Sequence, residues 1–60
     1  MADKTSVVTT VEGPKGSADV VEVFKDGSNQ PVYQVHFNGK VDTYVTEGEA
    51  GIEAMSAVGN

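Results

Sequence analysis

The side chains best suited to catalysis are one histidine and four serines. The only histidine, His36, and the serines Ser6, Ser17, Ser28 and Ser56 have the types needed for a nucleophile and its general base. No local motif accompanies any of these serines. A single histidine in a strand beside Lys40 is typical of a solvated or hydrogen-bonded surface residue, and titration of His36 at an interface is the other role left open. The sequence therefore predicts that the chain is not an enzyme.

Two groups of oxygen-bearing side chains have the composition of a metal site. The turn DGSN at 26–29 resembles a fragment of a calcium loop, but it lacks the alternating acidic spacing and the distant bidentate Glu of such a loop. Glu47, Glu49 and Glu53 are explained by capping of a helix and by its solvated face. We therefore expect no metal and no cofactor.

Phosphate groups are poor ligands for this chain. The segment GPKG at 13–16 and the pair Gly39-Lys40 both depart from the phosphate-loop pattern G-x-x-x-x-G-K-[ST]. Nine acidic residues against four lysines give a net charge of −5, and there is no arginine to contact a base edge. This charge opposes the nucleic-acid backbone and anionic lipids. We expect no direct contact with nucleic acid or with a membrane.

The same acidity leaves one alternative function open. Asp19, Glu22, Asp42 and the glutamates near the C-terminus could imitate phosphates and block a nucleic-acid-binding protein. The chain would then be an acidic inhibitor or adaptor of a larger basic protein. Nine acids diluted by four lysines are, however, ordinary for a small domain.

The chain is short and has few large apolar side chains. Its 60 residues accommodate one domain, 1–60, with a flexible start at 1–4, a sheet over 5–46 and a helix over 47–58. There is no cysteine, so no disulfide supports the core. The start MADKTSVV lacks the features of a signal peptide, and no apolar run is long enough for a membrane span. We expect a cytoplasmic protein that gains stability by association.

Hydrophobic periodicity predicts an α+β fold. Alternating or β-branched runs predict strands at 5–11, 18–25, 32–37 and 40–46, joined as an antiparallel meander. After Thr46 the period changes to that of an amphipathic helix, with Thr46 as N-cap, Glu49 three residues later and Gly59 as a stop. The helix is expected to pack on one face of the sheet, through a stripe comprising Gly51, Ile52, Ala54, Met55 and Val58.

The Asn38-Gly39 pair marks a hairpin, but two loop lengths compete. A two-residue type I′ turn would place Val35 opposite Asp42 and mix charge into the apolar face. A three-residue loop with a G1 bulge would place Val35 opposite Val41 instead. We favour the bulge because it separates an apolar face from a polar one; those faces comprise Tyr33, Val35, Val41, Val45, Val21 and Val23 on one side and Gln34, His36, Asp42 and Glu22 on the other.

The predicted sheet has more apolar surface than one short helix can cover. The first strand lies at an edge and is expected to have no charge, proline or bulge between Lys4 and Glu12, so it can accept another strand. The function we expect is a non-enzymatic protein-interaction module that forms a homodimer or binds a larger protein. Its expected interface comprises the edge residues Ser6, Val7, Val8, Thr9, Thr10 and Val11 and the anchors Phe24, Val32, Phe37 and Tyr44.

Overall fold

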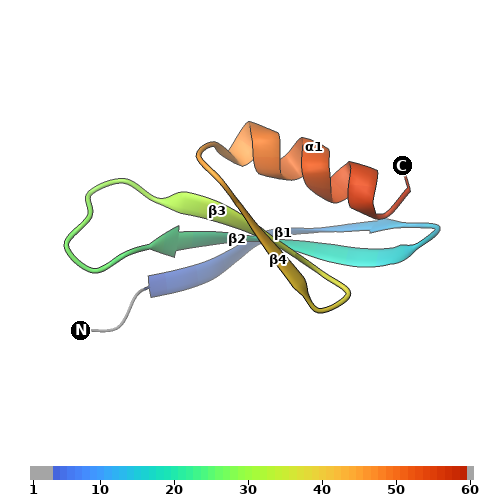
Figure 1. Cartoon of the computed structure of the whole chain (residues 1–60), viewed down its shortest axis with the longest axis horizontal. Helices are drawn as coiled ribbons and strands as arrows, with labels where there is room; N and C mark the ends of the chain where they lie inside the picture. The colour runs from blue at the N-terminus through green and yellow to red at the C-terminus, as the bar shows by residue number, and fades with distance from the viewer. Residues whose placement is uncertain (1–3, 60) are drawn as a thin grey trace.

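The computed structural model describes residues 4–59 and shows one antiparallel sheet with a helix on one side (Figure 1). The elements are β1 (Lys4–Gly13), β2 (Gly16–Phe24), β3 (Val32–Phe37), β4 (Lys40–Tyr44) and α1 (Glu47–Ala57). The strands are paired in the order β1-β2-β3-β4. The predicted α+β fold is thus confirmed. Of the segment expected to be flexible, residues 1–3 lie outside the described residues, and Lys4 is the first residue of β1.

The hairpin between β3 and β4 turns through two residues, Asn38 and Gly39. Both have a positive φ, 52° and 82°, as a type I′ turn requires. Val35 therefore pairs with Asp42, and the three-residue loop with a G1 bulge expected from the sequence is wrong. The type I′ turn matches the right-handed twist of the strands. Because β4 is an edge strand, Asp42 can share a face with Val35 and still remain exposed.

This register changes which side chains share a face. Val35 is buried on the side of α1, whereas Val41 lies on the opposite side and is 52% exposed. Tyr33 and Val35 still share a face, but Val21 and Val23 lie on the other one, because successive side chains of a strand alternate. The expected grouping of these valines with Val35 is therefore wrong.

The core lies between the sheet and α1 and is built of small side chains. Its buried members are Ala18, Val20, Val35, Ala50, Ala54 and Val58. Four larger or peripheral side chains pack against them and are partly buried: Val11, Tyr33, Phe37 and Tyr44.

The helix begins and ends where the sequence predicts. The Thr46 hydroxyl accepts a hydrogen bond of 3.2 Å from the Glu49 backbone N–H, which satisfies one of the free donors at the first turn. At the other end Val58 is the C-cap, and Gly59 has a φ of 88°, the left-handed conformation that glycine adopts without strain.

The buried face of α1 differs from the predicted stripe. Ala54 and Val58 are buried as expected, together with Ala50. Ile52 and Met55, which were expected to face the sheet, are 62% and 45% exposed, so this part of the prediction is wrong. The structural reason is close packing, because alanines spaced four residues apart form a flat ridge that lets the helix approach the strands.

α1 covers only part of its side of the sheet. Its 11 residues span about 16 Å at about 1.5 Å per residue, whereas the 10 residues of β1 span about 33 Å. In Figure 1 the start of β1, the end of β2 and the loop that leads to β3 project beyond the N-terminal end of α1. Among residues 4–59, no helix covers this end of the sheet.

Candidate interaction surfaces

The two edges of the sheet differ in length and in charge. β4 has 5 residues and includes Lys40 and Asp42, and both shortness and charge discourage pairing with another strand. β1 has 10 residues and is exposed from Lys4 to Thr10. No charged residue or proline lies between Lys4 and Glu12. The predicted edge residues, 6–11, all lie in β1, which is the edge better suited to strand addition.

A β-bulge interrupts β1 at Val8. Val7 pairs with Val21 and Thr9 pairs with Val20, so Val8 is an additional residue in β1. The expectation that this strand has no bulge is therefore wrong, because β-branched residues and serine suit a regular and a bulged strand equally well. A bulge is also one of the features that discourage pairing at a sheet edge. A partner strand would meet two regular segments, one on each side of Val8.

The four predicted anchor side chains do not gather at one place. Phe37 and Tyr44 are partly buried against the core beside α1. Phe24 lies on the same side of the sheet, at the end of β2, and is partly buried. Val32 lies on the opposite side. The anchors were grouped on the basis of the wrong hairpin register, and the structure brings only Phe37 and Tyr44 to a common site.

The side of the sheet away from α1, which we call the open face, carries four neighbouring valines. They are Val7, Val21, Val23 and Val32, and we call them the valine patch. Val7 pairs with Val21, and Val23 pairs with Val32. Val7 is 61% exposed, whereas Val21 and Val23 are 9% and 3% exposed. Because α1 lies on the other side, neighbours on the open face itself must shield these two valines.

Polar side chains surround the valine patch. Asp19 pairs directly with His36, and the Thr10 hydroxyl donates a 3.0 Å hydrogen bond to the Asp19 carboxylate. The Nε2 atom of His36 lies 3.0 Å from Oε1 of Gln34. His36 is thus an exposed residue of the open face whose hydrogen-bond partner is an amide rather than a serine hydroxyl.

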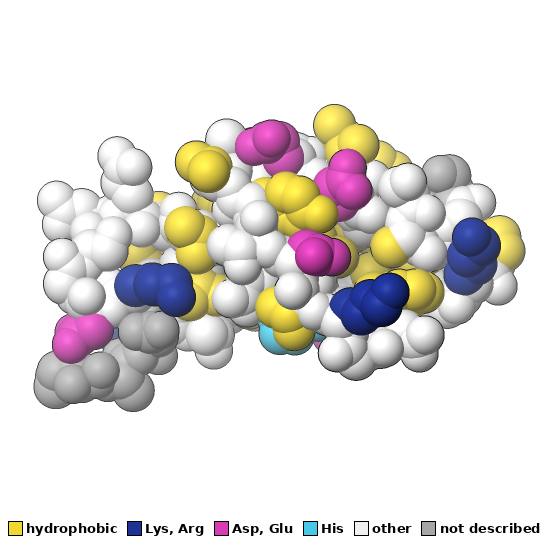
Figure 2. Space-filling view, in the orientation of Figure 1, with side chains coloured by type: hydrophobic (Ala, Val, Ile, Leu, Met, Phe, Trp, Pro, Cys, Tyr) yellow, Lys and Arg dark blue, Asp and Glu magenta, His cyan; other side chains and the backbone are white. Residues whose placement is uncertain are grey.

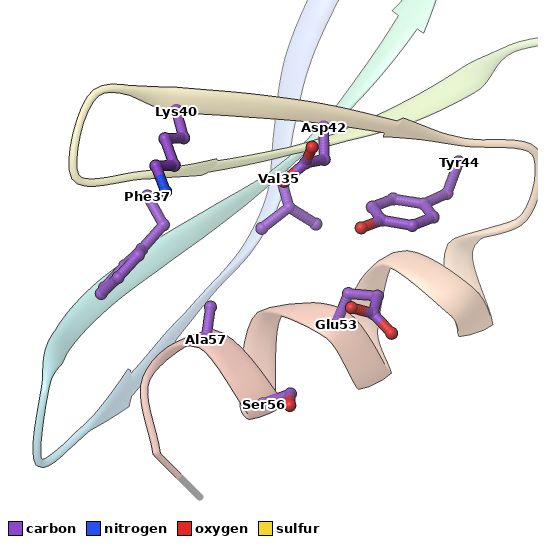
Figure 3. A pocket seen from close by; sticks show the side chains of 8 residues that line it. All are labelled: Val35, Phe37, Lys40, Asp42, Tyr44, Glu53, Ser56 and Ala57. Carbon is purple, nitrogen blue, oxygen red and sulfur yellow. The ribbon is translucent and has the colours of Figure 1, made fainter.

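A small cleft lies between the sheet and α1, on the side of β4 (Figure 3). Its volume is about 260 Å³, below the range of about 300–1,000 Å³ of most small-molecule sites. It is lined by Val35, Phe37, Lys40, Asp42, Tyr44, Glu53, Ser56 and Ala57. Tyr44 and Glu53 lie across from each other in it, from β4 and α1. His36 is absent from this lining, so Ser56 has no imidazole base beside it there.

Three carboxylates act on the Tyr44 phenol in this cleft. The pKa of Tyr44 is raised above 10.0, first because burial disfavours the phenolate and then because Glu53, Asp42 and Glu49 repel it. Figure 2 shows acidic side chains over α1 and the strand beneath it. Acidic side chains thus gather around α1, whereas the four residues of the valine patch carry no charge.

Residues 4–59 contain neither a cluster of metal-binding side chains nor a helix that could span a membrane. In this part of the chain, no three or more histidine, cysteine, aspartate or glutamate side chains are arranged to hold a metal ion. α1 is too short to cross a bilayer, and the described residues contain no helix with the length and apolar character to do so.

No family model, curated protein or solved structure matches this chain.

Proposed function

We propose that this chain is a non-enzymatic protein-interaction module that self-associates by pairing β1 with β1 of a second copy. The observation that carries the proposal is the contrast between the two edges of the sheet. β4 is short and charged, whereas β1 is long, exposed over 4–10 and uncharged over 5–11, with one bulge at Val8. Each backbone hydrogen bond formed across such an edge adds about 1 kcal/mol net.

The ends of β1 suit a second copy of the same strand. Two β1 strands related by a two-fold axis run antiparallel, so the Lys4 end of one meets the Glu12 end of the other. Lys4 pairs with Phe24 on the side of α1 and Glu12 pairs with Ser17 on the opposite side, so these two charges mark the ends of the uncharged segment without forming an ion pair between the copies.

The small core of this chain favours association, because contacts between copies would add to its stability. Its buried members are alanines and valines only, and no disulfide reinforces them in a chain of 60 residues. Domains of this size commonly depend on a disulfide, a metal or oligomerisation for stability.

The experiment is sedimentation equilibrium of the wild type and of Ser6→Lys. Ser6 is exposed in β1 and pairs with Glu22, so a lysine there leaves the monomer intact while placing a charge on the edge. We expect the wild type to associate with increasing concentration and Ser6→Lys to remain monomeric.

The matched control is Ile52→Lys, which adds the same charge on the outer side of α1, where Ile52 is 62% exposed. We expect it to associate like the wild type. A wild type that stays monomeric throughout, or a Ser6→Lys variant that associates as strongly as the control, would overturn the proposal.

A second candidate is an acidic inhibitor or adaptor, and the acidic side chains around α1 favour it. Asp42 and Glu53 line one cleft, and Glu47 and Glu49 lie in the first turn of α1. Lys40 lines the same cleft and interrupts the run of negative charge, which weakens any imitation of phosphates. The dependence of assembly on salt separates the two candidates, because salt weakens attraction between exposed charges and leaves apolar contacts in place.

A further inference from the structure

The cleft between β4 and α1 carries opposite charges at its two ends (Figure 3). Lys40 lies beside Phe37 at one end, and Glu53 lies across from Tyr44 at the other. Lys40, Asp42 and Tyr44 alternate along β4, so all three side chains face the side of α1. One end of the cleft therefore attracts an anionic group, and the other attracts a cationic group.

The charged groups of the cleft are accessible to a ligand. Lys40, Asp42 and Glu53 are exposed, and they form no ion pair within residues 4–59. An ammonium group can approach the two carboxylates, and a carboxylate can approach the lysine, without breaking an ion pair of the fold.

The middle of the cleft is apolar. Val35 is buried at 4% exposure, and Ala57 is half-buried on α1. The rings of Phe37 and Tyr44 are partly buried against the core. A short alkyl chain lying over these side chains would be withdrawn from water, which favours its binding.

The dimensions of the cleft limit the size of its ligand. Its volume of about 260 Å³ holds roughly nine non-hydrogen atoms, at about 30 Å³ for a group the size of water. Lys40 and Asp42 are two residues apart, which is about 7 Å along β4. A ligand that reaches both ends therefore needs its two charges separated by a chain of several carbon atoms.

We propose that this cleft binds a small zwitterion, namely an ω-amino carboxylate. Its ammonium group is held by Asp42 and Glu53, its carboxylate by Lys40, and its alkyl chain lies over Val35. The cleft lies beside β4, at the opposite edge of the sheet from β1. The proposal is therefore independent of β1 pairing, and both can hold in one molecule.

The test is an NMR titration of isotope-labelled wild type with ε-aminocaproate, an ω-amino carboxylate of about this size. We expect saturable shifts of the amide resonances of β4 and α1, with a dissociation constant on the order of 1 mM. Hexanoate and hexylamine each carry one of the two charges on a similar chain. They should bind about two- to fivefold more weakly, which is the effect of losing one exposed ion pair.

Substitutions at each end of the cleft test the assigned contacts. Lys40→Gln and Glu53→Gln should each weaken binding of ε-aminocaproate about two- to fivefold. The matched controls, Lys25→Gln and Glu47→Gln, make the same changes at exposed residues outside the cleft and should bind like the wild type. The amide spectrum of each variant shows whether it is folded.

Three results would overturn the inference. The first is the absence of saturable shifts up to about 50 mM ε-aminocaproate. The second is equal affinity for ε-aminocaproate, hexanoate and hexylamine, and the third is unchanged affinity in both Lys40→Gln and Glu53→Gln. None of these results bears on β1 pairing, which sedimentation tests separately.

Discussion

Gly13 lies directly against Val58, where the hairpin between β1 and β2 meets the end of α1. A Cβ atom at Gly13 would lie 2.5 Å from the Val58 carbonyl oxygen and 2.7 Å from one of its methyl carbons. The same carbonyl accepts a 3.0 Å hydrogen bond from the Lys15 backbone N–H. This contact fixes the C-terminal end of α1 on the sheet.

Gly13→Ala should therefore destabilise the fold. The added methyl group meets backbone as well as side-chain atoms of Val58, so the helix end must move. We expect the free energy of unfolding in urea to fall by about 1–3 kcal/mol. An unchanged or increased free energy would show that the helix end is not held in this way.

Gly51→Ala should have the opposite effect. Gly51 lies inside α1, and a Cβ atom there would meet no other atom within 4 Å. Alanine favours the helix by about 1 kcal/mol relative to glycine. Urea denaturation should show a stabilisation of that order, and a loss of stability would contradict the described environment of Gly51.

The stability of the fold should decrease in alkaline solution. Burial raises the pKa of Tyr33 above 10.0, with further contributions from its hydrogen bond to Glu22 and from the charges of Glu22 and Glu47. The pKa of Tyr44 is also raised, by burial and by neighbouring carboxylates. Above pH 10 the folded chain therefore holds these protons more tightly than the unfolded chain, and this contribution to stability is lost as the pH rises through the folded pKa values.

Phenolate absorbance checks this prediction when it is titrated in native buffer and in denaturant. The native tyrosines should ionise at higher pH than the unfolded ones. Tyr33→Phe should leave a single native transition that is still raised, belonging to Tyr44. Coincident native and unfolded titrations would show that neither phenol is shielded.

Self-association should survive high salt. The Debye length falls from about 10 Å at 0.1 M to about 3 Å at 1 M, so salt weakens attraction between exposed charges and also weakens the repulsion between copies of net charge −5. Sedimentation in about 0.1 M and about 1 M NaCl should show equal or stronger assembly at the higher salt. Assembly that is lost steeply with salt would instead indicate charge-driven association, as expected of the acidic adaptor.

The sequence predicted the elements better than their faces. The strands and α1 follow from period and turn chemistry, and the Thr46 cap and the Gly59 stop follow from their side chains. The register of Asn38-Gly39 did not follow, because the sequence suits two loops of different length. The separation of polar from apolar residues favoured the three-residue loop, which is wrong. The edge strand β4 tolerates Asp42 opposite Val35, because Asp42 remains exposed there.

The buried face of α1 also could not be predicted from hydrophobicity alone. Hydrophobicity favours Ile52 and Met55 as the buried side chains, yet the smaller Ala50 and Ala54 are buried, and Gly13 admits Val58 at the end of the helix. Only the spacing of the alanines together with the glycine opposite the helix end could have indicated it. The valine patch could have been found from Val21, Val23 and Val32, once the correct register was known.

The most direct test of the β1 pairing is amide hydrogen exchange of the wild type at low and high protein concentration, about 10 μM and about 1 mM. β1 and β4 are both edges, so half of the backbone N–H groups of each face outward in the monomer. We predict that exchange in β1 slows markedly as concentration rises, while exchange in β4 stays the same. Outward N–H groups of β1 that exchange equally fast at both concentrations would contradict the account.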